Sequence, residues 1–169
     1  ASHQVPLRFS VMIEPPAMRD KKREKYLTHF FCKSHISETY VERRQTRTGY
    51  INVSCPELTA VDLLTYQAKT GSVSRAATVL AELVEKLDFR SLGADFVKEV
   101  PVTSLQRLGY ILDEVLEEGE AAESVYGLLK CSGFVFQYVP LKAGKSSEGC
   151  ERNAKWRVIV NETIEIDEL

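Results

Sequence analysis

Hydrophobic residues change their spacing twice along this chain of 169 residues, and that order constrains the fold more than any other feature. The first third holds alternating runs rich in aromatic and β-branched residues, typical of strands: PLRFSVMIE, FFCKSHIS and TGYINVS. Residues 54–132 instead follow the spacing of amphipathic helices, and the tail returns to strand patterns. We therefore predict an α+β fold, in which a mixed β-sheet from N- and C-terminal strands packs against a central cluster of four to five helices.

The length suits a single domain covering residues 1–169. We expect N-terminal strands over 5–53, a helical region over 54–132 and C-terminal strands over 134–166. Within the first region, Arg19–Tyr26 is expected to form a short charged helix after two prolines. No apolar run approaches the roughly 20 residues of a membrane span, and the first residues lack a secretion signal, so the sequence predicts a cytoplasmic protein without a membrane partner.

The cysteine and histidine pattern gives little reason to expect a metal or a cofactor. Four cysteines are spread without a repeated spacing, which favours reduced thiols over a disulfide framework. His29, Cys32 and His35 have an H-x-x-C-x-x-H spacing, but in a strand a step of three alternates faces, and no fourth ligand lies nearby in the sequence. We predict neither a metal site nor a cofactor.

The segment SCPELTAVDLL places two carboxylates in an otherwise apolar stretch. Ser54 and Glu57 have the S-x-x-E spacing of a capping box, in which the carboxylate reaches back to the N–H of the cap. Asp62 shares a polar stripe with Thr59, Tyr66 and Lys69, which predicts a solvated or locally hydrogen-bonded carboxylate. Both acids are therefore expected to shape the helix, with partner contact or catalysis as the alternatives.

Two features predict closely fitted packing. Gly109 lies beside an apolar leucine stripe, where a glycine costs about 1 kcal/mol relative to alanine, so a close approach by another helix is expected. Gln106 and Arg107 form either a surface pair or an interhelical hydrogen-bonding pair. Trp156 has a large ring to bury and one N–H to satisfy, and Asn161 can pin a turn through its side chain.

The formal charge of −2 conceals an uneven distribution. Residues 19–47 carry nine Lys and Arg and four Asp and Glu. Since the totals are 22 and 24, the rest of the chain carries 13 Lys and Arg and 20 Asp and Glu. This basic region is the best candidate for contact with nucleic-acid phosphates or another partner, with a solvated charged surface as the alternative. Its candidate contact residues are Lys21, Lys22, Arg23, Lys25, Arg43, Arg44 and Arg47.

Three segments resemble the C-terminal domain of the AbiEi antitoxins, the regulator half of type IV toxin-antitoxin systems in bacteria. SCPELTAVDLLTY is similar to the family's S-x-P-E-x-T-A-L-D-L block, LQRLGYILDEV to its A-Q-R-L-G-Y-L-L block, and KWRVIVNETIEID to its closing W-R-x-I-V-N strand and acidic end. The family-like positions, to which no catalytic role attaches, are Glu57, Thr59, Asp62, Gln106, Arg107, Gly109, Trp156, Arg157 and Asn161.

The resemblance implies an antitoxin and transcriptional regulator of the abortive-infection type that counteracts a nucleotidyltransferase toxin by binding and is not an enzyme. Operator DNA would be read only through an upstream winged-helix domain, and no such pattern precedes Val5 in this sequence. Two alternatives remain open: a nucleic-acid-contacting accessory domain that uses the basic region, and a nuclease-like enzyme.

Overall fold

The computed structural model describes residues 7–166, which fall into two compact units. One unit ends at Val41 and the other begins at Glu42. Residues 5 and 6 of the expected strand region lie outside the described residues. Helices and strands occupy separate stretches of the chain, which confirms the α+β class.

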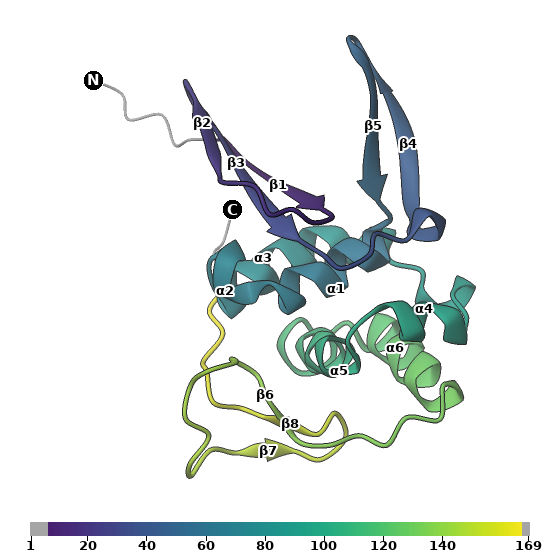
Figure 1. Ribbon diagram of the computed structural model, residues 1–169. Helices are drawn as coiled ribbons and strands as arrows, with labels where there is room; N and C mark the ends of the chain where they lie inside the picture. Colours follow the sequence, from purple (N-terminus) through teal and green to yellow (C-terminus); the bar gives the residue numbers. More distant parts are fainter. Residues whose placement is uncertain (1–6, 167–169) are drawn as a thin grey trace. The chain divides into compact units, whose positions relative to one another are not determined.

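The first unit is built on a three-stranded sheet (Figure 1). Strand β1 (Leu7–Ile13) runs parallel to β3 (Tyr26–Cys32), and β2 (Lys21–Arg23) pairs antiparallel with β3, so the order is β1-β3-β2. A short 3-10 turn, η1 (Glu38–Tyr40), follows the sheet. Phe31, on the central strand, is 1% exposed and is the one residue of this sheet that is fully buried.

The predicted helix over residues 19–26 is wrong, because this segment forms β2 and the turn into β3. Glu24 adopts a left-handed backbone with a φ of 51° in that turn. Asp20 fixes the approach, since its carboxylate accepts the N–H of Phe30 at 3.1 Å and lies 2.6 Å from Nδ1 of His29. Pairing with β3 therefore overrides the local helical preference of the charged residues.

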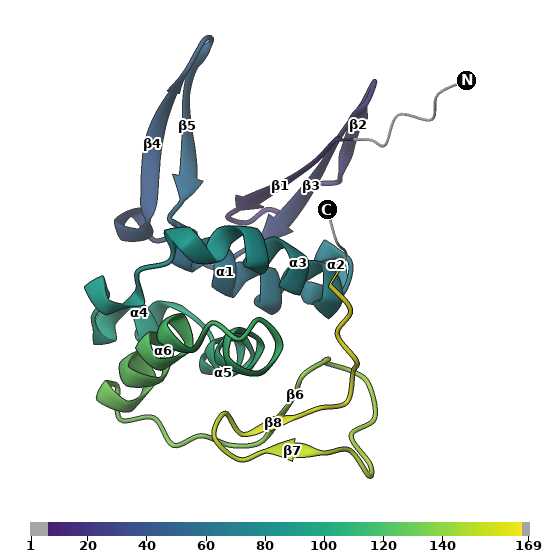
Figure 2. The same ribbon diagram turned by 180° about the vertical axis from the view of Figure 1, so that it is seen from behind.

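The second unit opens with a hairpin and continues as a helical bundle. Strands β4 (Val41–Thr46) and β5 (Gly49–Ser54) form a separate two-stranded sheet, and Figure 2 shows this hairpin standing away from the helices of its unit. Gly49 begins β5 with a φ of 147°, in the left-handed region that favours glycine. The carbonyl of Gly49 accepts the hydroxyl of Thr46 at 3.0 Å, which closes the turn.

Six helices follow the hairpin in the part of the chain that the structure describes, and the core lies among them. They are α1 (Pro56–Thr65), α2 (Gln67–Thr70), α3 (Val73–Leu83), α4 (Ala94–Glu99), α5 (Val102–Tyr110) and α6 (Gly119–Cys131), with 3-10 turns η2 (Val84–Lys86) and η3 (Phe89–Ser91) and a π-helical turn η4 (Ile111–Val115). Helix α5 contacts both α1 and α6, and the leucines of its stripe are fully buried. Within residues 7–166, no helix has the length and apolar character needed to cross a membrane.

The C-terminal strands are shorter than predicted and do not join the N-terminal ones. Strands β6 (Val139–Pro140), β7 (Arg152–Asn153) and β8 (Val158–Ile159) form a third sheet in the order β6-β8-β7, so the described strands make three small sheets in place of one mixed sheet. Side chains explain the interruptions. Asn153 accepts the N–H of Trp156 at 2.9 Å, and Arg157 has a φ of 52°, so the backbone turns where a longer strand was expected.

Among the glycines of the described residues, Gly109 is the one at which an added Cβ would lie nearest to a neighbouring atom. A Cβ placed on Gly109 would lie 1.9 Å from Cζ3 of Trp156. The Trp156 side chain is fully buried and meets the ring of Tyr126 edge-on, with centroids 5.3 Å apart. The close approach that the sequence predicted is therefore present, but an indole ring from the C-terminal segment makes it, not another helix.

Replacing Gly109 with alanine is expected to destabilise the protein by about 3 kcal/mol, because the methyl group overlaps a ring that cannot retreat within a close-packed core. Gly127→Ala in α6 is the matched control, since a Cβ there meets nothing within 4 Å. That control is expected to gain about 0.5–1 kcal/mol from helix propensity. Urea denaturation of both variants measures the difference, and equal midpoints would contradict the packing argument.

Candidate functional site

The start of α1 is held by contacts other than the predicted capping box. Cys55 is the N-cap, and its sulfur accepts the N–H of Leu58 at 3.5 Å. Burial raises the pKa of the Cys55 thiol, which favours the neutral form as this acceptor. Ser54 instead bonds the hydroxyl of Thr59 at 2.7 Å, and Thr59 in turn donates to the Cys55 carbonyl at 2.9 Å.

The Glu57 carboxylate accepts a backbone N–H from another element, so the capping-box prediction is wrong for this residue as well. Its Oε1 accepts the backbone N–H of Asp88 at 2.7 Å, and the residue is only 7% exposed. Asp88 begins the turn η3, so this carboxylate ties α1 to the connection between α3 and α4. This hydrogen bond between a carboxylate and a backbone N–H therefore joins two separate elements of the unit.

Asp62 is buried, which excludes the solvated carboxylate, one of the two alternatives that the sequence pattern predicted. It is 7% exposed, whereas Lys69 of the expected polar stripe is exposed. The stripe breaks because α1 ends at Thr65 and a new helix, α2, begins at Gln67, so residues beyond Thr65 no longer continue the same face. The carboxylate of Asp62 is therefore a buried polar group of the helical unit.

Gln106 and Arg107 donate hydrogen bonds to the C-terminal segment, so they form neither the surface pair nor the interhelical pair that the sequence left as alternatives. Gln106 Nε2 donates to the carbonyls of Gln137 and Trp156, both at 2.9 Å. Arg107 Nε donates to the carbonyl of Pro140 at 2.8 Å, and burial lowers the pKa of its guanidinium. Helix α5 thus presents donors to backbone acceptors that the short strands leave free.

A π-helical turn directs two acids toward the same segment. Asp113 Oδ2 accepts the indole N–H of Trp156 at 2.9 Å and the ammonium of Lys155 at 2.8 Å. Glu114, one residue later, accepts the amide of Asn153 at 3.0 Å. The widened turn η4 places these neighbours beside the C-terminal segment, and π-turns of this kind often mark functional or strained positions. Sequence reasoning missed Asp113 because nothing local signals a π-turn.

The electrostatics of Asp113 favour its charged form. Burial alone would raise the pKa of this carboxyl, but the hydrogen bonds from Lys155 and Trp156 outweigh it and hold the pKa below its usual range. Lys155 also bonds Glu123 at 2.6 Å, and the hydrogen bonds to Asp113 and Glu123 raise the pKa of its ammonium. This is a structural ion-pair cluster, because each charge is already matched.

Asn161 holds the turn at residues 142–145 through its side chain, the role in a turn or an edge that the sequence predicted. Its Oδ1 accepts the N–H of Lys142, and its Nδ2 donates to the carbonyls of Lys142 and Lys145, at 2.9 and 3.0 Å. Glu162 next to it binds the ammonium groups of the same two lysines at 3.0 and 2.6 Å. Arg157, in contrast, is exposed and lies over the ring of Tyr138 at 5.3 Å.

The family-like positions therefore do not converge on one cleft. Across residues 7–166, no group of three or more His, Cys, Asp or Glu is arranged to hold a metal ion. His29 and Cys32 lie on β3, the strand that the sequence predicted there, and His29 lies beside Asp20. His35 lies 3.8 Å from Glu14.

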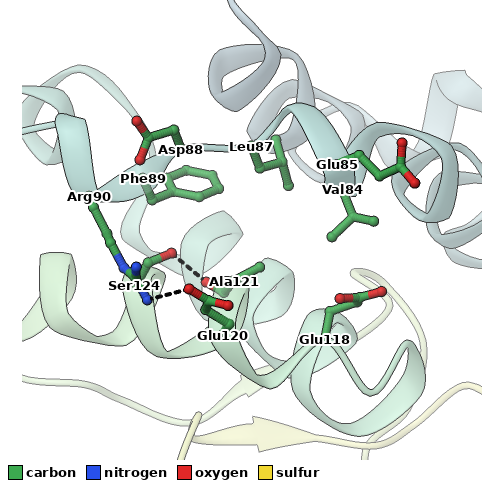
Figure 3. A pocket seen from close by; sticks show the side chains of 10 residues that line it. All are labelled: Val84, Glu85, Leu87, Asp88, Phe89, Arg90, Glu118, Glu120, Ala121 and Ser124. Atoms are coloured by element: carbon green, nitrogen blue, oxygen red, sulfur yellow. Dashed lines mark hydrogen bonds and ion pairs between the residues drawn. The ribbon is translucent and has the colours of Figure 1, made fainter.

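A shallow hollow of about 420 Å³ opens between the η2–η3 segment and the start of α6 (Figure 3). Four acids contribute to its lining: Glu85, Asp88, Glu118 and Glu120. Arg90 is the basic residue of the lining, and it pairs with Glu120 at 2.8 Å. An acidic rim does not fit a phosphate-bearing ligand.

The basic residues singled out in the sequence divide between the two units. In the first unit, Lys21 and Lys25 lie over the rings of Phe30 and Tyr26, at 5.9 and 5.6 Å from their centroids, while Lys22 and Arg23 are exposed on β2. In the second unit the three arginines belong to the hairpin: Arg43, Arg44 and Arg47.

The hairpin combines cations with an exposed aromatic ring. Arg43 lies over the ring of Tyr50 at 4.3 Å, and Tyr50 is 59% exposed. Arg44 pairs with Glu42 at 2.6 Å, and Arg47 stands in the turn. Because both strands expose residues on both faces, the hairpin is an arm with accessible arginines and an aromatic stacking surface.

Comparison with known proteins gives a family match. The sequence model of the AbiEi antitoxin C-terminal domain matches residues 1–114, which include the first similar block and all but the last residue of the second, and end before the Trp156 block. Among solved structures, the crystal structure of the RV2827C protein from Mycobacterium tuberculosis aligns with 23% identity and a TM-score of 0.46, covering 62% of this chain. The chain spans about a third of that protein's length, the aligned part being 34%. No curated protein matches the chain.

The Asp113 cluster predicts a pH dependence of stability. Because the pKa of Asp113 is depressed in the folded state, its contribution is present above the ordinary aspartate range, about 4, and is lost as the pH falls through the folded value. Asp113→Asn is expected to lower the free energy of unfolding by about 1 kcal/mol at pH 7.

Urea unfolding from pH 7 down to about pH 3 is the measurement, and the difference from wild type is expected to shrink as the pH falls. Asp95→Asn is the control, because Asp95 forms a fully exposed pair with Lys98 that contributes little. A constant difference between wild type and Asp113→Asn across this range would contradict the assignment.

Proposed function

The chain belongs to the AbiEi antitoxin C-terminal domain family, and on this premise we propose that it counteracts a nucleotidyltransferase toxin of a type IV system by binding, without catalysis of its own. A toxin-antitoxin or regulator role follows from the family. The binding mechanism rests on one observation: the carboxylate and amide groups of the family-like blocks hold the chain together. Glu57 is the clearest case, since its carboxylate accepts a backbone N–H from another element.

An enzyme needs groups that are free to exchange protons or to contact a substrate, at a place where they converge. Glu57, Gln106 and Asn161 are each bound to backbone groups and are at most 7% exposed. Breaking these bonds for chemistry would leave buried donors or acceptors without partners, at about 1–3 kcal/mol each. The arrangement therefore favours action through a surface.

Two substitutions at Glu57 separate architecture from catalysis. Glu57→Gln keeps a carbonyl oxygen that can accept the Asp88 N–H, so it is expected to neutralise the toxin as wild type does when co-expressed with the adjacent nucleotidyltransferase. Glu57→Ala leaves that N–H unsatisfied, so it is expected to lose about 1–3 kcal/mol of stability and to neutralise only in proportion to the protein that remains folded.

Growth and the amount of folded protein are measured in the same cultures. A folded, abundant Glu57→Gln protein that fails to rescue growth would show that the carboxylate itself acts. Continued growth arrest with abundant wild-type protein would reject the antitoxin function.

A second candidate function is contact with nucleic acid, and the hairpin β4–β5 is the observation that favours it. Exposed arginines attract backbone phosphates, and an exposed aromatic ring offers a surface on which a base can stack. Arg43 and Tyr50 supply both groups on one arm. The acidic hollow of Figure 3 lacks this character, so the candidate is confined to the hairpin within the second unit.

Arg43→Ala is expected to weaken binding to DNA or RNA and to reduce the slope of log K against log salt concentration by roughly 1, the effect of losing one phosphate contact. Lys98→Ala is the matched control, since it removes an exposed cation of the same charge from α4. Titration at several salt concentrations measures both slopes. The absence of binding at low salt, or equal slopes in both variants, would remove this candidate.

A further inference from the structure

The two edges of the β1-β3-β2 sheet differ in kind. The β2 edge is three residues long and entirely cationic, with Lys21, Lys22 and Arg23 all exposed. A short edge that carries lysine and arginine is a common device against pairing with another strand. The β1 edge has seven residues and carries one charge, that of Arg8.

The outer side of β1 has backbone groups ready to pair. The N–H of Leu7 bonds the carbonyl of Lys25 and the carbonyl of Ile13 accepts the N–H of Lys33, both at 2.8 Å, so the odd-numbered residues face β3. Backbone groups alternate in direction along a strand, so those of Arg8, Ser10 and Met12 point to the open edge. No strand within residues 7–166 pairs with β1 on that side.

An apolar stripe runs along the same strand. Leu7, Phe9 and Val11 occupy alternate positions and share one face, and they remain 51%, 50% and 38% exposed. Tyr26, the register partner of Leu7 on β3, extends the stripe and is 40% exposed. A long, open edge with exposed apolar residues is the arrangement that strand addition uses.

We propose that β1 pairs antiparallel with β1 of a second copy of this chain, about a two-fold axis at Ser10. Ser10 is the midpoint of Leu7–Ile13, so this register pairs the whole strand. Leu7 then lies opposite Ile13 and Phe9 opposite Val11, which continues the apolar stripe across the junction. Arg8 lies opposite Met12, so no like charges face each other directly.

The same contrast between edges explains why the assembly stops at two copies. A two-fold contact uses the same patch of both chains and closes on itself. The remaining outer edges of the joined sheet would be the two β2 strands, whose three cations oppose further pairing. This inference does not depend on the antitoxin role, so the outcome of the toxin-neutralisation experiment does not affect it.

A charge exchange at Ser10 tests the two-fold register. Ser10 is exposed and its backbone faces away from β3, so substitutions there leave the ladder of the monomer intact. Ser10→Lys places two lysines opposite each other and is expected to raise the dimer dissociation constant at least about tenfold. Mixing it with Ser10→Asp is expected to restore association, because the mixed pair brings opposite charges together.

Sedimentation equilibrium over a range of protein concentrations measures these constants, with circular dichroism to confirm folding. Ser34→Lys adds the same charge at an exposed residue outside the strands and is expected to associate as wild type does. Wild-type protein that stays monomeric at every concentration overturns the proposal. So does a Ser10→Lys variant that dimerises as tightly as wild type, or a mixture with Ser10→Asp that fails to recover association.

Discussion

The seating of Trp156 against Gly109 is the contact on which the second unit depends. The strands of the β6-β8-β7 sheet are dipeptides, and a sheet of that size has no stability of its own. Its attachment comes from the indole ring, which fills the space that a side chain at Gly109 would occupy and donates its N–H to Asp113. The π-turn after α5 is the local distortion that makes this acceptor available.

Other buried polar side chains also form hydrogen bonds with residues far away in the sequence. Gln106 bonds two carbonyls, one of them 50 residues away, and Glu57 bonds an N–H 31 residues away. Each contact fixes an irregular segment to a helix, because loops and short strands leave backbone groups that need partners. The helices of this unit therefore hold the irregular segments in place, and the side chains of Gln106 and Glu57 are occupied by these hydrogen bonds. This supports a protein that acts by presenting a surface.

The sequence predicted the class of the fold and the helices well, because hydrophobic spacing over ten or more residues is a strong local signal. The penalty of a glycine beside a leucine stripe also predicted that something approaches Gly109, but the ring that does so lies 47 residues later (109 to 156), beyond local reasoning. Glu57 has the sequence spacing of a capping box, but its carboxylate accepts the N–H of Asp88 in place of the N–H of the cap. Likewise, the basic run divides between two units, since neighbours in sequence need not share a surface.

Strands β1 and β5 carry several of the exposed large apolar residues of the described chain, and the segment 134–138 after α6 carries others. In the helical core, Gly109 costs about 1 kcal/mol in helix propensity, and the absence of a side chain there leaves room for the fully buried indole ring of Trp156. The strands outside it leave Phe9 at 50% and Tyr50 at 59% exposure. The same chain buries other aromatic rings completely, such as the ring of Trp156. The exposed rings on β1 and β5 are the features on which the two proposed contacts depend, the strand pairing at β1 and the nucleic-acid contact at the β4–β5 hairpin.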